Sequence, residues 1–198
     1  MTTYAKAETL TGALLAPLDG VRAFVLVVAF SLLTALAAQV AVPLPFTPVP
    51  ITLQTFMVLL TGALLGRRLG ALAMFAYLIE GAGGLPFFAF GHSGIAYLLF
   101  APTSGYLLSY PLAAFLTGWL AERGWDRKFL PAAAAMALGS LVILAGGWLG
   151  LLRFFSPATA FITGVAPFLV GDLIKLALAA AVLPTGWALL RRTDARQD

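Results

Sequence analysis

The chain has 198 residues, of which 61% are hydrophobic and only 10% charged, and its formal net charge is +4. Soluble domains carry about 25% charged residues, so this composition excludes an ordinary soluble domain and predicts an integral membrane protein. Cysteine is absent, which excludes a disulfide framework, a thiolate metal site and a nucleophilic cysteine. The basic residues are spread over short loops and are not interleaved with aromatic residues, so we expect no nucleic-acid partner.

Apolar segments alternate with short polar loops along the whole chain, and about 20 residues cross a bilayer core. They lie at about 22–42, 51–66, 69–90, 103–121, 129–151 and 164–190. We therefore predict an all-α integral membrane protein, a bundle of six transmembrane helices in a single membrane domain over residues 1–198. The short tails are about 1–21 and 191–198. Ten of the twelve basic residues fall on one side of this arrangement, so the positive-inside rule predicts that both termini are cytoplasmic.

The first apolar segment has a second interpretation. Ala35-Leu36-Ala37 after an apolar stretch resembles a signal-peptidase site. The stretch from Ala23 to Val42 is longer than an ordinary signal core and a long region precedes it, so we favour a retained membrane helix.

The first outward loop contains four prolines between Pro43 and Pro50, which fix the backbone repeatedly and remove hydrogen-bond donors. Thr47 lies within this loop, and Gln54 follows between two threonines at the outer end of the next helix. A stiff loop beside clustered polar side chains is typical of a preorganised lid over a small ligand. An ordinary helix-breaking connection is the alternative.

The third segment carries Tyr77 and Glu80, followed by several glycines and Pro86, which permit a sharp bend near the outer surface. Tyr77 lies about one turn deeper than Glu80 on nearly the same face and offers both an aromatic wall and a hydroxyl. His92 is the only histidine of the sequence, and no carboxylate stands at ligand spacing, so we expect no metal site. After the next loop, Thr103 or Ser104 begins a helix that carries Tyr106.

The last apolar run contains two charged residues, Asp172 and Lys175. Each charge costs roughly 2.5 to 3.5 kcal/mol at the centre of a membrane helix. A separation of three residues places both side chains on one helix face, where pairing reduces the cost. The pair is either a buried ion pair that fixes helix register or part of a polar ligand site.

Four stretches, taken in order and with their spacing, resemble the BioY family over about residues 22–190. They are Pro43 to Thr55 (PLPFTPVPITLQT), Tyr77-Leu78 with Gly84-Leu85-Pro86, Pro102 to Leu107 (PTSGYL), and Gly171 to Lys175 (GDLIK). BioY proteins are biotin-specific substrate-binding (S) components of energy-coupling-factor (ECF) transporters. The resemblance implies a multi-pass protein of a prokaryotic plasma membrane, surrounded by lipid, that captures biotin from outside and cooperates with a transmembrane coupling subunit and ATPase subunits. It implies neither enzymatic activity nor a cofactor.

By position, the resemblance implies that Asp172 and Lys175 anchor the head group of biotin, with Gln54 and Tyr77 alongside. The expected pocket wall adds the following residues: Thr47, Phe87, Glu80, Tyr106, Phe46 and Phe88. A ureido ring offers two N–H donors and a carbonyl acceptor, which a carboxylate and a lysine complement. The residues alone indicate only a small amphipathic ligand, so another small vitamin remains possible.

The sequence contains no P-loop motif, so active uptake requires ATPase partners or an ion gradient. A solitary carrier driven by a cation gradient through Asp172 is therefore an alternative, and an intramembrane enzyme is a more distant one. For partner docking, Ser31 and Ala35 occupy the place where the family resembles an alanine-xxx-alanine motif. Internal packing is the other interpretation of these two small residues. The chain also departs from the family at Ala101 and Ser104, where glycine is common.

Overall fold

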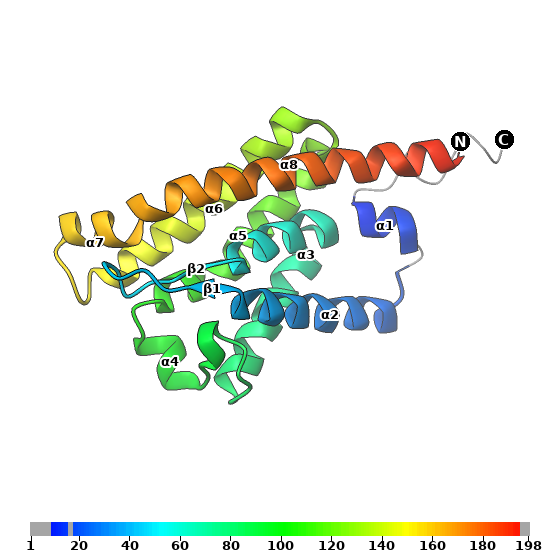
Figure 1. Ribbon diagram of the computed structural model, residues 1–198. Helices are drawn as coiled ribbons and strands as arrows, with labels where there is room; N and C mark the ends of the chain where they lie inside the picture. Colours follow the sequence, from blue (N-terminus) through cyan, green and yellow to red (C-terminus); the bar gives the residue numbers. More distant parts are fainter. Residues whose placement is uncertain (1–8, 16–17, 195–198) are drawn as a thin grey trace.

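The structure is a computed structural model that describes residues 9–15 and 18–194, with side chains through Leu190. Helices make up most of it (Figure 1). In chain order they are α1 (Leu10–Leu15), α2 (Gly20–Gln39), α3 (Gln54–Ala82), α4 (Ile95–Phe100), α5 (Ser104–Ala121), α6 (Phe129–Leu151), α7 (Pro157–Gly164) and α8 (Ala166–Asp194). The 3-10 turns η2 (Ala89–Gly91) and η3 (Trp125–Arg127) lie in the connections. Within these described residues, four stretches are long and apolar enough to cross a membrane: Gly20–Gln39, Gln54–Ala82, Phe129–Leu151 and Pro157–Leu190.

The element α3 consists of two helical halves that fold back on each other. Gly66 interrupts it with φ 82° and ψ 177°, a backbone conformation that favours glycine. The amide of Gln54 donates to the hydroxyl of Tyr77, although 23 residues of straight helix would separate them by about 34 Å. The close approach needs two further glycines, because a Cβ on Gly70 would lie 2.8 Å from the Cα of Gly62. The break falls between the predicted segments 51–66 and 69–90.

Large apolar side chains cover the outside of the molecule. On α2, Val21 and Phe24 are about 70% exposed, and Leu36 is nearly as exposed. The opposite face of α2 is buried and carries small or polar residues, including Thr34 and Ala38. A soluble protein does not present this much apolar surface, whereas a lipid environment accommodates it. The distribution of side chains therefore agrees with the predicted membrane protein.

Several short elements add to the predicted six-helix layout. The strands β1 (Ala41–Val42) and β2 (Ile51–Thr52) pair antiparallel and close the proline-rich loop as a hairpin. The expected amino-terminal tail contains α1, and the third outward loop contains α7, which begins after the N-cap residue Ser156. The predicted end of the third segment at residue 90 is wrong, because the helix ends at Ala82, before two glycines and Pro86.

The molecule has two distinct ends (Figure 1). The elements α1 and the carboxyl end of α8 lie at one end, and the β1–β2 hairpin, α4 and α7 lie toward the other. The helices α3, α5, α6 and α8 pack together between these ends. Their packing leaves a cavity close to the hairpin.

Candidate ligand-binding site

A cavity with about 560 Å³ of atom-free space, including its open part, lies among α3, α5, α6 and α8. The hairpin covers it with Val49, Pro50 and Thr52. The other lining residues are Gln54, Thr55, Phe88, Ala89, Tyr97, Thr103, Tyr106, Leu107, Tyr110, Ile143, Leu144, Phe168, Asp172 and Lys175. The proline-rich loop therefore borders the cavity as a paired hairpin, and its role as a lid stays a prediction.

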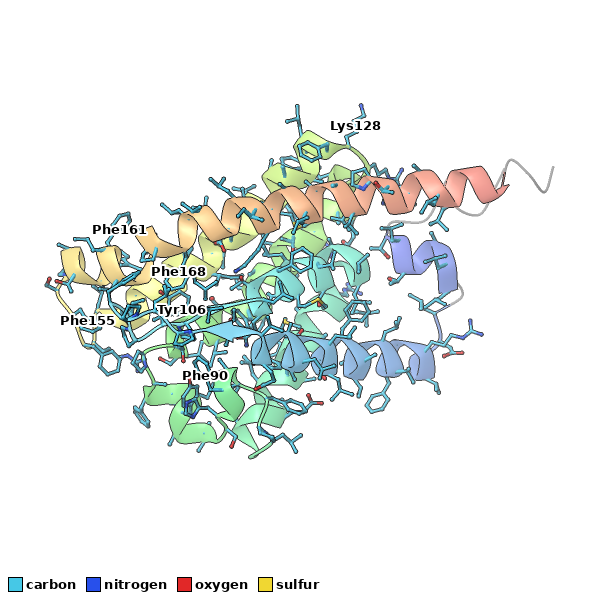
Figure 2. All side chains as sticks on the ribbon, in the orientation of Figure 1. Phe90, Tyr106, Lys128, Phe155, Phe161 and Phe168 are labelled. Atoms are coloured by element: carbon cyan, nitrogen blue, oxygen red, sulfur yellow. The ribbon has the colours of Figure 1, made fainter. Side chains whose placement is uncertain are left out.

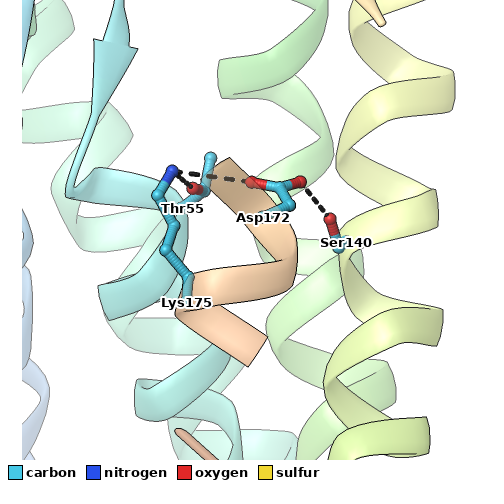
Figure 3. Close-up of polar contacts among 4 residues, drawn as sticks. All are labelled: Thr55, Ser140, Asp172 and Lys175. Atoms are coloured by element: carbon cyan, nitrogen blue, oxygen red, sulfur yellow. Dashed lines mark hydrogen bonds and ion pairs between the residues drawn. The ribbon is translucent and has the colours of Figure 1, made fainter. Parts of the chain in front are cut away.

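Asp172 and Lys175 form the charged part of the cavity wall (Figure 3). The Lys175 ammonium lies 3.5 Å from one Asp172 carboxylate oxygen and donates to the Thr55 hydroxyl at 2.9 Å. The other Asp172 oxygen accepts a hydrogen bond from Ser140 at 2.5 Å. Asp172 is only 8% exposed. The pair thus joins α8 to α3 and to α6, which is more than a register contact within one helix.

Gln54 lies beside this group and is also held by hydrogen bonds. Its amide nitrogen donates to the Tyr77 hydroxyl, which in turn donates to the Phe87 carbonyl at 3.1 Å. Gln54 lines the cavity and is 3% exposed, whereas Tyr77 is fully buried behind it. The carbonyl oxygen of Gln54 can accept from a ligand, and its amide nitrogen has a second N–H besides the one given to Tyr77.

Aromatic rings form the apolar part of the wall. Phe88 stacks on Tyr97 with ring centroids 5.6 Å apart, and Tyr106 packs against Phe168 at 6.2 Å. Figure 2 shows Tyr106 and Phe168 next to each other toward the α7 end of the molecule. The Tyr106 hydroxyl donates to the carbonyl of Gly164 at 2.5 Å, which fixes the break between α7 and α8. The cavity therefore combines flat apolar surfaces with a compact polar cluster, as an amphipathic ligand requires.

The structure brings four of the eight predicted binding residues to the cavity wall: Asp172, Lys175, Gln54 and Tyr106. The other four do not line it. Tyr77 supports Gln54 from behind, and Phe87 supplies its backbone carbonyl to Tyr77 while its neighbour Phe88 turns into the wall.

Thr47 and Glu80 lie outside the cavity wall. The hydroxyl of Thr47 accepts from the backbone of Val49 at 3.2 Å within the hairpin loop. Glu80 is half-buried, and one of its carboxylate oxygens has no hydrogen-bond partner among the described residues. Phe46, expected as an apolar wall, is 61% exposed on the outer loop. Neither spacing nor proline content indicates which way a loop side chain points.

Sequence reasoning missed Ser140, Tyr97, Tyr110 and Phe168. Ser140 is the one hydroxyl-bearing residue of α6, and this was the available signal. The lone histidine, His92, stacks on Tyr97 with centroids 4.6 Å apart, and no group of three potential metal ligands occurs among the described residues.

Two further expectations were that Ser31 and Ala35 contact a partner and that Ser104 departs from the family pattern. Ser31 and Ala35 lie on the inward face of α2 at 0% and 5% exposure, and Ser31 donates to the Val28 carbonyl of its own helix at 2.9 Å. In this arrangement neither is accessible to a partner. Ser104, a departure from the family pattern, is buried and accepts a hydrogen bond from the Arg153 guanidinium.

Comparisons with known proteins agree with this architecture. The model of the BioY family matches residues 5–192. The "Probable biotin transporter BioY" of Pyrococcus horikoshii is 43% identical over 157 residues, which cover 79% of this chain and 91% of the relative. The "Biotin transporter BioY" of Thermotoga maritima is 38% identical over 155 residues, covering 77% and 88%.

A solved structure shares the fold. The S-component for biotin from an ECF-type ABC transporter, a crystal structure, aligns with a TM-score of 0.76 at 24% sequence identity. The alignment covers 83% of this chain and 90% of that one. From the family match and the two relatives, this chain belongs to the BioY family.

Proposed function

We propose that this protein takes up biotin, as the membrane-embedded S component of an ECF transporter. It captures biotin from the outside in the cavity beneath the hairpin and delivers it to the cytoplasm with an ATP-hydrolysing module. The relatives named biotin transporters support the ligand, and the solved S-component supports the fold. The observation that carries the proposal is the Asp172–Lys175 pair, buried in the wall of a cavity whose other lining residues are uncharged.

The polar cluster complements a ureido ring. The Asp172 carboxylate and the Gln54 carbonyl accept from N–H groups, and the Lys175 ammonium donates to a carbonyl. These three groups lie on α8 and α3 and are held by Ser140, Tyr77 and Thr55. Such preorganisation reduces the entropy lost on binding, so it favours high affinity.

We also propose the predicted topology, six membrane-crossing segments in a single domain with both termini in the cytoplasm. These segments are α2, the two halves of α3, α5, α6 and α8. A salt bridge of 3.2 Å between Arg67 and Glu122 joins two basic loops that the positive-inside rule places on one side. The Thr11 hydroxyl of α1 donates to the Leu64 carbonyl at 2.6 Å, so α1 lies close to the same loop, which supports the proposal.

The remaining expectations extend this proposal. The membrane is the plasma membrane of a prokaryotic cell, and the partners are lipid, a transmembrane coupling subunit and ATPase subunits. The protein carries no cofactor and no catalytic activity. The docking role of Ser31 and Ala35 stays a prediction, which requires α2 to move before a partner could reach them.

Uptake of labelled biotin by proteoliposomes tests the function. We expect accumulation that depends on ATP when the chain is reconstituted with coupling and ATPase subunits, and none with the chain alone. Accumulation by the chain alone that an uncoupler abolishes would instead support the solitary cation-driven carrier. Asp172→Asn in the complete complex should reduce uptake at low biotin concentrations.

A further inference from the structure

The charges that line the cavity sum to zero. Among the described lining residues, only Asp172 and Lys175 are charged at neutral pH, and they already pair at 3.5 Å. A ligand carboxylate placed near this pair would meet an attractive and a repulsive charge at similar distances, and the two interactions would largely cancel. The wall therefore holds no uncompensated positive charge for the acidic tail of a ligand.

The hydrogen bonds of the pair lead to the same conclusion. The Lys175 ammonium has three N–H donors, of which Thr55 and Asp172 accept two. Asp172 accepts from Ser140 as well and keeps further lone pairs. The pair thus offers a ligand one N–H donor on Lys175 and several acceptor lone pairs on Asp172. A neutral group with both an acceptor and N–H donors, such as a ureido group, matches this set. A carboxylate, which only accepts, would leave the Asp172 lone pairs without donors.

Arg153 and His92, near the hairpin end of the molecule, contact other groups and do not line the cavity. Arg153 donates to the carbonyls of Leu99 at 2.7 Å and Gly150 at 3.2 Å and to the Ser104 hydroxyl, and it does not line the cavity. His92 stacks on Tyr97 and is not a lining residue. The hairpin and η2 contribute only uncharged lining residues.

We propose that the negative charge on the tail of the ligand contributes little to its affinity for the site. This inference rests on the proposed function and extends its substrate class to ring-intact biotin derivatives with a neutralised tail, such as the primary amide or the methyl ester. The ureido ring occupies the Asp172–Lys175 cluster, and the tail extends along uncharged surface. Specificity resides in the ring, and the charge of the carboxylate contributes little.

The test compares biotin with biotinamide, which differs only in replacing the carboxylate by a neutral amide. Purified wild-type protein is titrated calorimetrically with each ligand. We expect dissociation constants within tenfold of each other. A loss of more than tenfold for the amide would overturn the inference, even though biotin binding itself would uphold the proposed function. Failure of the wild-type protein to bind either ligand would overturn the proposed function and this inference with it.

A lysine variant adds an independent measurement. Lys175→Met keeps the aliphatic stem, and it should weaken binding of biotin and biotinamide by the same factor, within threefold. If it weakened biotin alone, Lys175 would be contacting the carboxylate and the inference would be wrong. Lys128→Met, in the basic connection before α6 and outside the cavity lining, is the matched control and should alter neither affinity.

Discussion

Ser140→Ala tests whether the buried carboxylate of Asp172 must be held by a second helix. The substitution removes one hydroxyl from α6, and with it the 2.5 Å hydrogen bond to the Asp172 oxygen that does not face Lys175. Alanine fits the space that serine occupied and favours the helix. The carboxylate is then fixed from one side only, by Lys175, so it can rotate away from the position in which it accepts from biotin.

The size of the effect follows from the charge on the acceptor. A hydrogen bond to a charged group contributes about 1.5 to 3 kcal/mol, about twice as much as a neutral one. Asp172 retains its pairing with Lys175, so we expect the loss in binding free energy to fall near the lower limit. A loss of about 1.4 kcal/mol corresponds to a tenfold weaker dissociation constant.

Calorimetric titration with biotin measures this change. Ser31→Ala is the matched control: Ser31 is also buried, but its hydroxyl donates to a carbonyl of its own helix. Ser140→Thr restores a hydroxyl and should recover most of the affinity. If Ser140→Ala binds biotin within twofold of wild type while Asp172→Asn does not, the positioning role of Ser140 is refuted.

Three further predictions concern the charged pair itself, the buried carboxyl of Asp126 and the close packing at Gly118. Asp172→Asn or Lys175→Ala should weaken biotin binding by at least tenfold, about 1.4 kcal/mol, and unchanged titration curves would contradict their role as anchors. Burial raises the pKa of Asp126 from 3.8 to about 6, so the folded state binds the proton more tightly than the unfolded state does. This carboxyl therefore costs stability increasingly as the pH rises from about 4 to about 6. Asp126→Asn should raise Tm relative to wild type at pH 7 and not at pH 4; an equal difference at both pH values would refute this assignment. Gly118→Ala would press its Cβ against the backbone of the loop between the two halves of α3, and should cost about 1 to 3 kcal/mol and lower Tm. Gly20→Ala, with no atom within 4 Å of its Cβ, is the control, and an equal Tm for both variants would contradict the proposed close packing.

Hydropathy and charge predicted the long apolar helices because both signals extend over many residues. The elements that were missed are short. The helix α1 is six residues long, and its Leu10 is buried through packing near Gly186 at the far end of the chain. The β1–β2 pairing involves two residues on each side of a proline-rich loop. Such elements depend on tertiary contacts, which local patterns do not contain.

The site residues that could be predicted from the sequence are those whose burial costs much free energy. Asp172 and Lys175 stand out because a charge in an apolar run needs a compensating partner. Ser140 carries no such signal, since a hydroxyl can bond to its own helix at little cost. Phe87 and Phe88 could not be told apart either, because they lie in an irregular loop without a periodic pattern.

Titration of the purified protein with biotin is the decisive experiment for the proposed function. We predict tight, saturable binding of one biotin per chain, which Asp172→Asn weakens at least tenfold. Absence of biotin binding, together with binding of a different small vitamin, would contradict the assignment of the cavity and of its polar cluster.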